Sequence, residues 1–225
     1  MLVVHKIIFL LIFVSVFSCG KSYKESSIGN STSSSVNKSA FESKELFPSE
    51  YVKWVQNKDN GFLKEQTNGD MTFSLLYKPI DYIICQEERK DDIKTESVKT
   101  KTAELGGMDY YDLKISLDKE QGELLKYKIA APAEYNERVK YFAFDMQKDV
   151  MMIHGSDTIS CAMFHFEREY DAAPEAIFLL AFPKHNKIGK RTILFHDKVF
   201  GNGIIKFDYS GKEISRLPKL KTTVD

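Results

Sequence analysis

The residues of this chain that could act as nucleophile, acid or base are few and widely spaced. Cys161 and His165 form the nearest pair of a thiol and an imidazole, a combination that hydrolases use as nucleophile and general base. On a strand, residues four apart lie about 13 Å from each other, so this pair could act only with partners from other strands. The spacing therefore predicts a buried thiol and a core or interface histidine.

The other histidines do not form a recognisable metal or catalytic motif. His165 and Glu167 alternate on one face of a predicted strand, and His196 precedes an aspartate, but neither pair has the spacing of a His-Glu-x-x-His zinc site. Ser156 lacks the Gly-x-Ser-x-Gly frame of a serine nucleophile, and residues 154–157 have the composition of a tight turn. We predict no catalytic residues, no metal ligands and no bound cofactor.

These side chains must be positioned by a chain that is rich in predicted strands. Apolar and polar residues alternate with the period of a half-buried strand over residues 71–77, 111–117 and 204–209. Two further runs, 158–168 and 176–182, are apolar on both faces, which predicts neighbouring central strands covered on both sides. In the last strand apolar residues alternate with Lys206 and Asp208, which indicates a strand near a sheet edge.

The predicted helices are short and few. Trp54 and two other apolar residues share one face of a helix over 50–57, and the mixed charges of residues 87–104 indicate a solvated helix face or loop. Residues 139–146 are predicted to form a further strand. Because strands outnumber helices and no strand–helix alternation appears, the predicted fold class is α+β and β-rich, a mostly antiparallel sheet or β-sandwich with a few short helices.

Composition excludes some classes of partner. The chain has 225 residues, with 32 Lys plus Arg and 32 Asp plus Glu, and this balance argues against a nucleic-acid-binding protein, which normally shows a basic excess. Sixteen Phe and eleven Tyr supply enough aromatic mass for a substantial core. Cys85 and Cys161 both lie in apolar runs, so they could be buried thiols or, in an exported protein, one disulfide.

The first twenty residues have the pattern of an export signal. A short basic flank precedes the apolar run of residues 7–17. That run is too short for a bilayer core, which requires about 20 apolar residues, and is typical of a secretory signal peptide. Val16, Ser18 and Cys19 resemble the lipobox of bacterial lipoproteins, although Phe17 is bulkier than the pattern usually has.

The lipobox resemblance implies that Cys19 becomes the first residue of the mature chain and carries two or three acyl chains such as palmitate, which together anchor a protein firmly. The Ser-rich composition that follows predicts a flexible tether. The predicted organisation is a signal peptide over 1–18, the lipidated cysteine and tether over 19–45, a single globular β-rich domain over 46–218 and a flexible tail over 219–225.

The anchor implies a membrane-bound protein of the cell envelope, in the outer membrane. The sequence does not determine the membrane leaflet or whether the domain lies on the periplasmic or the surface side. Lys21, Lys24 and Glu25 loosely resemble the charged residues that follow the lipidated cysteine in surface-exported lipoproteins of the Bacteroidetes type. Anchor, tether and near-neutral charge favour a non-enzymatic interaction or assembly subunit with an envelope-protein partner. Its docking surface is expected at the edge strand 204–209 or at the helix that carries Trp54.

Charged and aromatic residues lie at the end of a predicted core strand. Their position indicates a candidate functional site, because such sites are often built at the rim of a sheet. These rim residues are His165, Glu167, Arg168 and Tyr170. Two alternative functions stay open. A small-ligand or glycan-binding lipoprotein would line its groove with Tyr110, Tyr111 and Tyr170, and an envelope hydrolase would combine His154 or His165 with Asp157 or Glu167.

Overall fold

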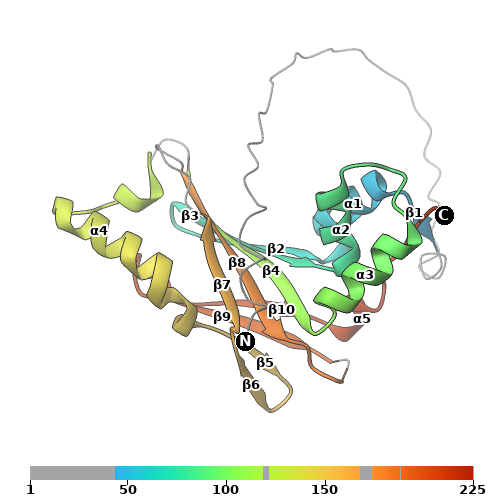
Figure 1. Cartoon of the computed structure of the whole chain (residues 1–225). Helices are drawn as coiled ribbons and strands as arrows, with labels where there is room; N and C mark the ends of the chain where they lie inside the picture. The colour runs from blue at the N-terminus through green and yellow to red at the C-terminus, as the bar shows by residue number, and fades with distance from the viewer. Residues whose placement is uncertain (1–43, 119–121, 168–173, 188, 225) are drawn as a thin grey trace, which may run out of the picture. The chain divides into compact units, whose positions relative to one another are not determined.

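Two antiparallel sheets form the domain in the computed structural model, which describes residues 44–118, 122–167, 174–187 and 189–224 (Figure 1). The first sheet has the strand order β2 (Leu63–Asn68), β3 (Met71–Lys78), β4 (Met108–Leu117), β8 (Glu175–Pro183) and β7 (Met163–Glu167). The second has the order β10 (Gly203–Tyr209), β9 (Arg191–Asp197), β5 (Val150–His154) and β6 (Asp157–Ser160). The predicted α+β, β-rich class is confirmed.

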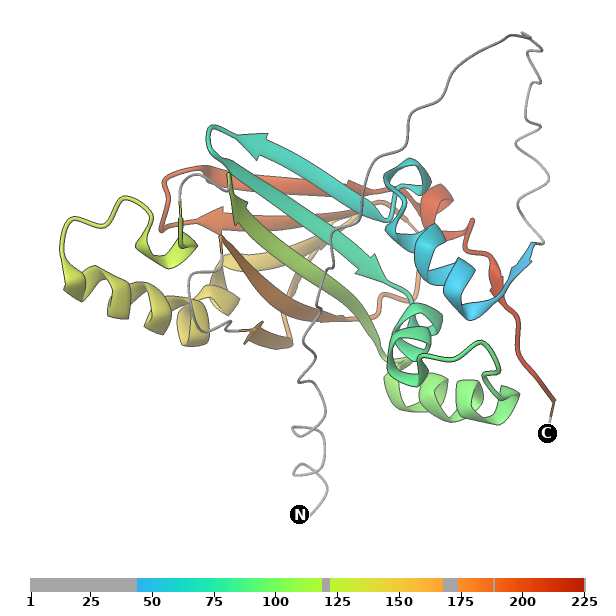
Figure 2. The ribbon, with the colours of Figure 1, turned by 90° about the horizontal axis from the view of Figure 1, so that it is seen from above.

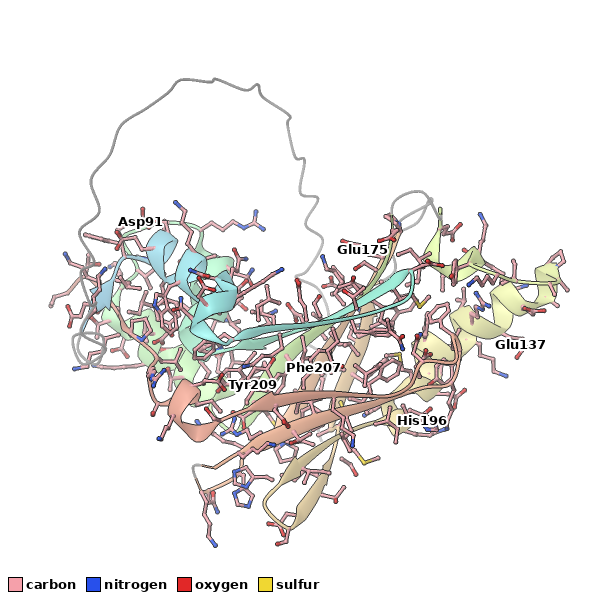
Figure 3. The ribbon with its side chains drawn as sticks, turned by 180° about the vertical axis from the view of Figure 1, so that it is seen from behind. Asp91, Glu137, Glu175, His196, Phe207 and Tyr209 are labelled. Atoms are coloured by element: carbon pink, nitrogen blue, oxygen red, sulfur yellow. The ribbon has the colours of Figure 1, made fainter. Side chains whose placement is uncertain are left out.

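The core lies between the facing sides of these two sheets. Phe73 of β3 and Phe195 of β9 have ring centroids 6.3 Å apart. Phe207 and Tyr209, labelled in Figure 3, are buried on β10, and the Tyr209 hydroxyl donates a hydrogen bond of 2.7 Å to the backbone carbonyl of Leu75 on β3. Aromatic rings therefore fill the space between the sheets, and β4, β5, β9 and β10 bury alternate side chains.

The prediction of one central strand over 158–168 is wrong. The segment forms two strands, β6 and β7, that are edges of different sheets. Between them, Cys161 is buried and its thiol donates to the carbonyl of Met163 at 3.0 Å. The chain passes from one sheet to the other there, so half-buried apolar residues of two strands, with the buried Cys161 between them, appear in the sequence as one apolar run. The other run, 176–182, does form a central strand, β8, between β4 and β7.

The helices gather at the two ends of the five-stranded sheet (Figure 2). At one end are α1 (Pro48–Gln56), η1 (Lys58–Asn60), α2 (Ile80–Glu88), α3 (Thr95–Leu105) and α5 (Gly211–Ile214), and at the other η3 (Leu124–Lys126), α4 (Pro132–Lys140), η4 (Tyr141–Asp145) and η5 (Met146–Asp149). The strand predicted over 139–146 is therefore wrong. That segment ends α4 and continues as the π-helical turn η4, in which Phe142 is buried and Phe144 is 74% exposed.

The two ends of the described domain are joined by a short parallel pair of strands. β1 (Glu45–Leu46) pairs with β11 (Lys219–Leu220), and the amide of Lys221 donates to the carbonyl of Leu46 at 2.8 Å. Residues 219–223, which the sequence placed in a flexible tail, are thus hydrogen-bonded to the domain as far as Thr223. Within the described ranges, no helix is both long enough and apolar enough to span a bilayer.

Candidate functional site

The outward side of the five-stranded sheet carries a connected set of apolar side chains, which we call the open face. Strand register fixes its layout, because Tyr110 of β4, Ala181 of β8 and Met163 of β7 lie in one row across the three strands. Ile177 and Leu179 continue the same side of β8. The open face thus consists of Tyr110, Ile177, Leu179, Ala181, Met163, His165 and Glu167, together with the charged residues Lys78, Asp112, Lys114 and Glu175.

Ion pairs between neighbouring strands border the apolar part of the open face. Lys78 lies 3.0 Å from a carboxylate oxygen of Asp112, and Lys114 lies 3.2 Å from one of Glu175. Burial raises the pKa of Asp112, and Lys78 partly offsets this. Met163 is 50% exposed, while Ile177 and Leu179 are half-buried. The surface therefore combines an apolar centre with charges of both signs at its border.

The structure brings together some of the rim residues predicted from the sequence. His165 and Glu167 both lie on the open face, opposite Leu179 and Ile177 of β8. Trp54 does not join them, since it lies on α1 and its ring packs against Phe62 with centroids 5.2 Å apart. Arg168, Tyr170 and the lipidation residue Cys19 lie outside the described residues.

The groove expected for a glycan is not formed by the two described tyrosines. Tyr110 lies on the open face, whereas Tyr111 points to the other side of β4 and is 1% exposed between the sheets. Successive side chains of a strand point to opposite faces. These two rings therefore cannot line one surface, and the third candidate, Tyr170, is outside the described residues.

The histidines and carboxylates considered for a hydrolase fall into two groups on different sheets, and in one of them His154 and Asp157 are register partners on β5 and β6. His154 is buried on β5 and its ring stacks on that of His185 at a centroid distance of 3.9 Å. Asp157 contacts His185 Nε2 at 3.2 Å, and His185 Nδ1 accepts a hydrogen bond from the backbone of Lys187. His165 and Glu167 lie on the other sheet. Sequence reasoning assigned no role to His185, which the fold places next to both His154 and Asp157.

The two described cysteines are free and buried, which excludes the disulfide alternative. Burial raises the pKa of Cys85 to about 12 and that of Cys161 to about 11. The Cys161 thiol is buried while His165 is exposed on β7, so the two do not form a nucleophile and base. Both thiols remain protonated at neutral pH, which makes them weak nucleophiles.

A buried polar cluster occupies the end of the sandwich nearest α1, α2 and α3. Arg191 Nη1 of β9 lies 2.9 Å from Asp109 Oδ2 of β4, although this contact lacks the alignment of a hydrogen bond. The Tyr77 hydroxyl donates to Asp109 Oδ1 at 3.2 Å. Burial raises the pKa of Tyr77 to about 12. Burial acts to lower the pKa of Arg191, but the Asp109 carboxylate outweighs it and keeps that pKa above its usual value.

This cluster borders a cavity of about 220 Å³ between the sheet end and the helices. The cavity is lined by Tyr51, Tyr77, Lys78, Pro79, Ile80, Asp81, Thr102, Met108, Asp109, Lys184 and Leu217. Sequence reasoning missed it because the lining residues come from segments far apart in the chain that meet only through strand register. The sequence did contain one indication. Asp109 stands two residues before Tyr111 and four before Leu113, so on a strand it lies on the same buried side as these two residues.

Comparisons with known proteins add little to this geometry. No known family model matches the chain, and no curated protein sequence matches it. A structure from Staphylococcus aureus subsp. aureus NCTC 8325, provisionally named a lipoprotein, has 9% sequence identity and a TM-score of 0.26, and the match covers 72% of this chain and 99% of that chain. A TM-score this low supports no conclusion about fold or function.

Proposed function

We propose that the protein is a lipid-anchored cell-envelope protein that serves as a non-enzymatic interaction or assembly subunit. The anchor rests on the signal-like residues 1–18 and on Cys19, and the outer membrane is the proposed location. The partner is another envelope protein. The single observation that supports docking is the open face of the five-stranded sheet, where apolar side chains lie on the side of the sheet that faces away from the core.

The open face carries apolar side chains on the side of the sheet that does not pack on the core. In an antiparallel sheet one side packs on the core and the solvated side is normally polar. Here Tyr110, the buried Ala181 and the half-exposed Met163 form one row across three strands, and Ile177 and Leu179 extend the apolar side chains along β8. Contiguous apolar surface with a charged border is typical of a protein interaction site.

The outward side of the other sheet does not have this continuity. Leu194 of β9 pairs with Lys206 of β10 on one side and Met151 of β5 on the other, and Met151 then faces Ser160. The apolar row there spans two strands, through Met151 and Leu194, whereas the row of Tyr110, Ala181 and Met163 spans three. The open face is therefore the better candidate for a partner that contributes a flat apolar surface with charges at its border.

The docking surfaces expected from the sequence are less favourable. β10 is an edge strand, as predicted, and its Ile204 is 57% exposed. However, the side-chain amide of Gln66 on β2 donates to the backbone carbonyl of Lys206, which occupies one of the edge acceptors. Trp54 uses one side of its ring to pack on Phe62. Both surfaces are partly used within the domain.

Site-specific photocrosslinking in living cells tests the proposal. A benzophenone amino acid is placed at Leu179 on the open face, and the matched control carries it at Leu194, which is also a half-buried leucine on a central strand. We expect a discrete adduct with one envelope protein from position 179 and none from position 194. The same adduct from both positions, or no adduct from position 179, would overturn the open-face assignment.

The anchor is tested separately with the Cys19→Ala variant. We expect this substitution to abolish incorporation of radioactive fatty acid and to release the protein from the membrane fraction, because one residue carries the whole lipid anchor. Retention of the label in the variant would exclude Cys19 as the lipidated residue. The crosslinking result at position 179 does not depend on this outcome, so the two parts of the proposal can fail independently.

A further inference from the structure

Two of the charged side chains that line the cavity at the sheet end have no protein partner. Lys78 is paired with Asp112, and Asp109 is paired with Arg191. Within the part of the chain that the structure describes, the side chains of Asp81 and Lys184 make no hydrogen bond or ion pair. The cavity wall therefore has one carboxylate and one ammonium group available to a ligand.

The environment of Asp81 favours a positively charged group beside it. Asp81 lies in the first turn of α2 and is half-buried, and burial raises its pKa. Tyr51 is fully buried on the facing helix α1, where burial raises its pKa and the Asp81 carboxylate adds to the rise. A partly desolvated carboxylate without a partner is unfavourable as an anion. A bound cation would supply the missing partner.

Asp109 provides a second and independent observation at the same cavity. Its side chain is 2% exposed, and its Oδ2 atom accepts no hydrogen bond, although Arg191 Nη1 lies 2.9 Å away. Buried polar atoms are normally satisfied by protein or by a bound molecule. An N–H donor from a ligand in the cavity would give this oxygen the aligned hydrogen bond that Arg191 does not supply.

We propose that this cavity binds a small organic molecule that carries a protonated amine. The ammonium group lies at Asp81, and a ligand that also has a carboxylate places it at Lys184. The volume of about 220 Å³ is below the range of about 300–1,000 Å³ that is usual for drug-sized ligands, so a ligand of amino-acid size fits. This inference is independent of docking through the open face.

Isothermal titration calorimetry on the mature full-length chain in detergent tests the site with three probes of similar size: n-butylamine, norvaline and n-butyrate. We expect n-butylamine and norvaline to bind and n-butyrate to give no binding heat, because the anion lacks the group that Asp81 and Asp109 attract. No binding by either amine, or equal binding by n-butyrate, would overturn the proposal.

Substitutions assign the two ends of the ligand. Asp81→Asn should weaken the binding of n-butylamine and norvaline at least tenfold, whereas the control Asp92→Asn, which removes the same charge from an exposed position outside the cavity, should not change it. Lys184→Ala should weaken norvaline and leave n-butylamine unchanged. Unfolding curves verify that the variants are folded. Unchanged amine binding by folded Asp81→Asn would contradict the assignment of the ammonium site.

Discussion

At the scale of single residues, the Asp109 and Arg191 pair is the most demanding electrostatic feature of the described domain. Both side chains are buried between the sheets. Removing a carboxylate and a guanidinium from water is costly, and their attraction repays this cost only while both are present. Tyr77 adds a hydrogen bond to Asp109 at 3.2 Å. The intact pair therefore adds little to net stability, but replacing only one of its two residues is costly.

We predict that Arg191→Met lowers the free energy of unfolding by about 3–5 kcal/mol, because it leaves the Asp109 charge buried without a partner. The double variant Arg191→Met, Asp109→Asn should recover a large part of this loss, since no uncompensated charge remains. Urea denaturation of the wild type, both single variants and the double variant completes the cycle. Additive losses in the double variant would show that the two side chains do not interact.

The candidate site could be predicted from the sequence only in part at this scale. Burial of Phe73, Leu75 and Tyr77 follows from their alternation along one strand. The partner of Asp109 does not, because Arg191 lies on a strand of the other sheet and the contact depends on how the two sheets face each other. His165 and Glu167 were identified as rim residues from their strand-end position, but their apolar neighbours on β8 required the strand register.

At the scale of secondary-structure elements, Glu213 connects the short helix α5 to strand β2. Its carboxylate accepts from the Ser210 amide at 2.7 Å and lies 2.7 Å from Lys64 Nζ. The neighbouring position 61 favours glycine, since its φ of +82° is a conformation that other residues rarely adopt and a Cβ there would require Glu213 to move. One side chain thus caps a helix and holds it against the edge of the five-stranded sheet.

We predict a pH-dependent loss of stability for Glu213→Gln. Burial acts to raise the pKa of Glu213, but Lys64 and the Ser210 amide outweigh it and hold the pKa below its usual value. The folded-state pKa is therefore lower than the unfolded-state value of about 4.3, so the stabilisation is present above that value and is lost as the pH falls through the folded-state pKa.

The expected difference between wild type and Glu213→Gln is about 0.5–1 kcal/mol at pH 7, because the pair is partly exposed to solvent, and it should shrink at pH 3. Urea denaturation at the two pH values measures it. The control is Glu65→Gln, which removes the more exposed ion pair with Lys58 and no helix cap. A difference that stays constant between pH 7 and pH 3 would contradict this assignment.

Elements with a single environment along their length were predicted correctly, and elements that change environment were not. The strands over 111–117 and 204–209 each bury one side throughout. The alternation of apolar and polar residues in their sequences therefore predicts correctly which side chains are buried. The segment over 158–168 crosses from one sheet to the other at Cys161. The segment over 139–146 places Phe142 in the core and Phe144 in solvent within a π-helical turn, a spacing that resembles strand alternation.

At the scale of the whole molecule, the pairing of β1 with β11 makes the C-terminal residues part of the described domain. Lys219 and Lys221 donate backbone hydrogen bonds to the carbonyls of Lys44 and Leu46, at 3.2 Å and 2.8 Å. Leu46 is 4% exposed and belongs to the core. The composition of 219–225 alone suggested a tail, because polar residues with few apolar neighbours do not reveal pairing with a distant strand.

We predict that deletion of residues 219–225 lowers the free energy of unfolding by about 1–3 kcal/mol, since it removes the β11 hydrogen bonds and exposes Leu46. The melting temperature should fall by several degrees, with about 2–4 °C per kcal/mol for a chain of this size. Deletion of residues 224–225 is the control, because Val224 is 91% exposed and its loss should leave the melting temperature unchanged. Equal melting temperatures for both deletions would show that β11 does not stabilise the domain.

The same pair of strands determines how the domain would respond to mechanical force. Tension on the chain that precedes Lys44 would reach the domain through β1. Because β1 and β11 are parallel, a pull along their axis loads the bonds from Lys219 and Lys221 in shear, so both must break together before the load passes to α1. A lipid-anchored protein held by a distant partner would thus meet tension first at this short pair of strands, before the load reaches the sandwich that carries the open face and the cavity.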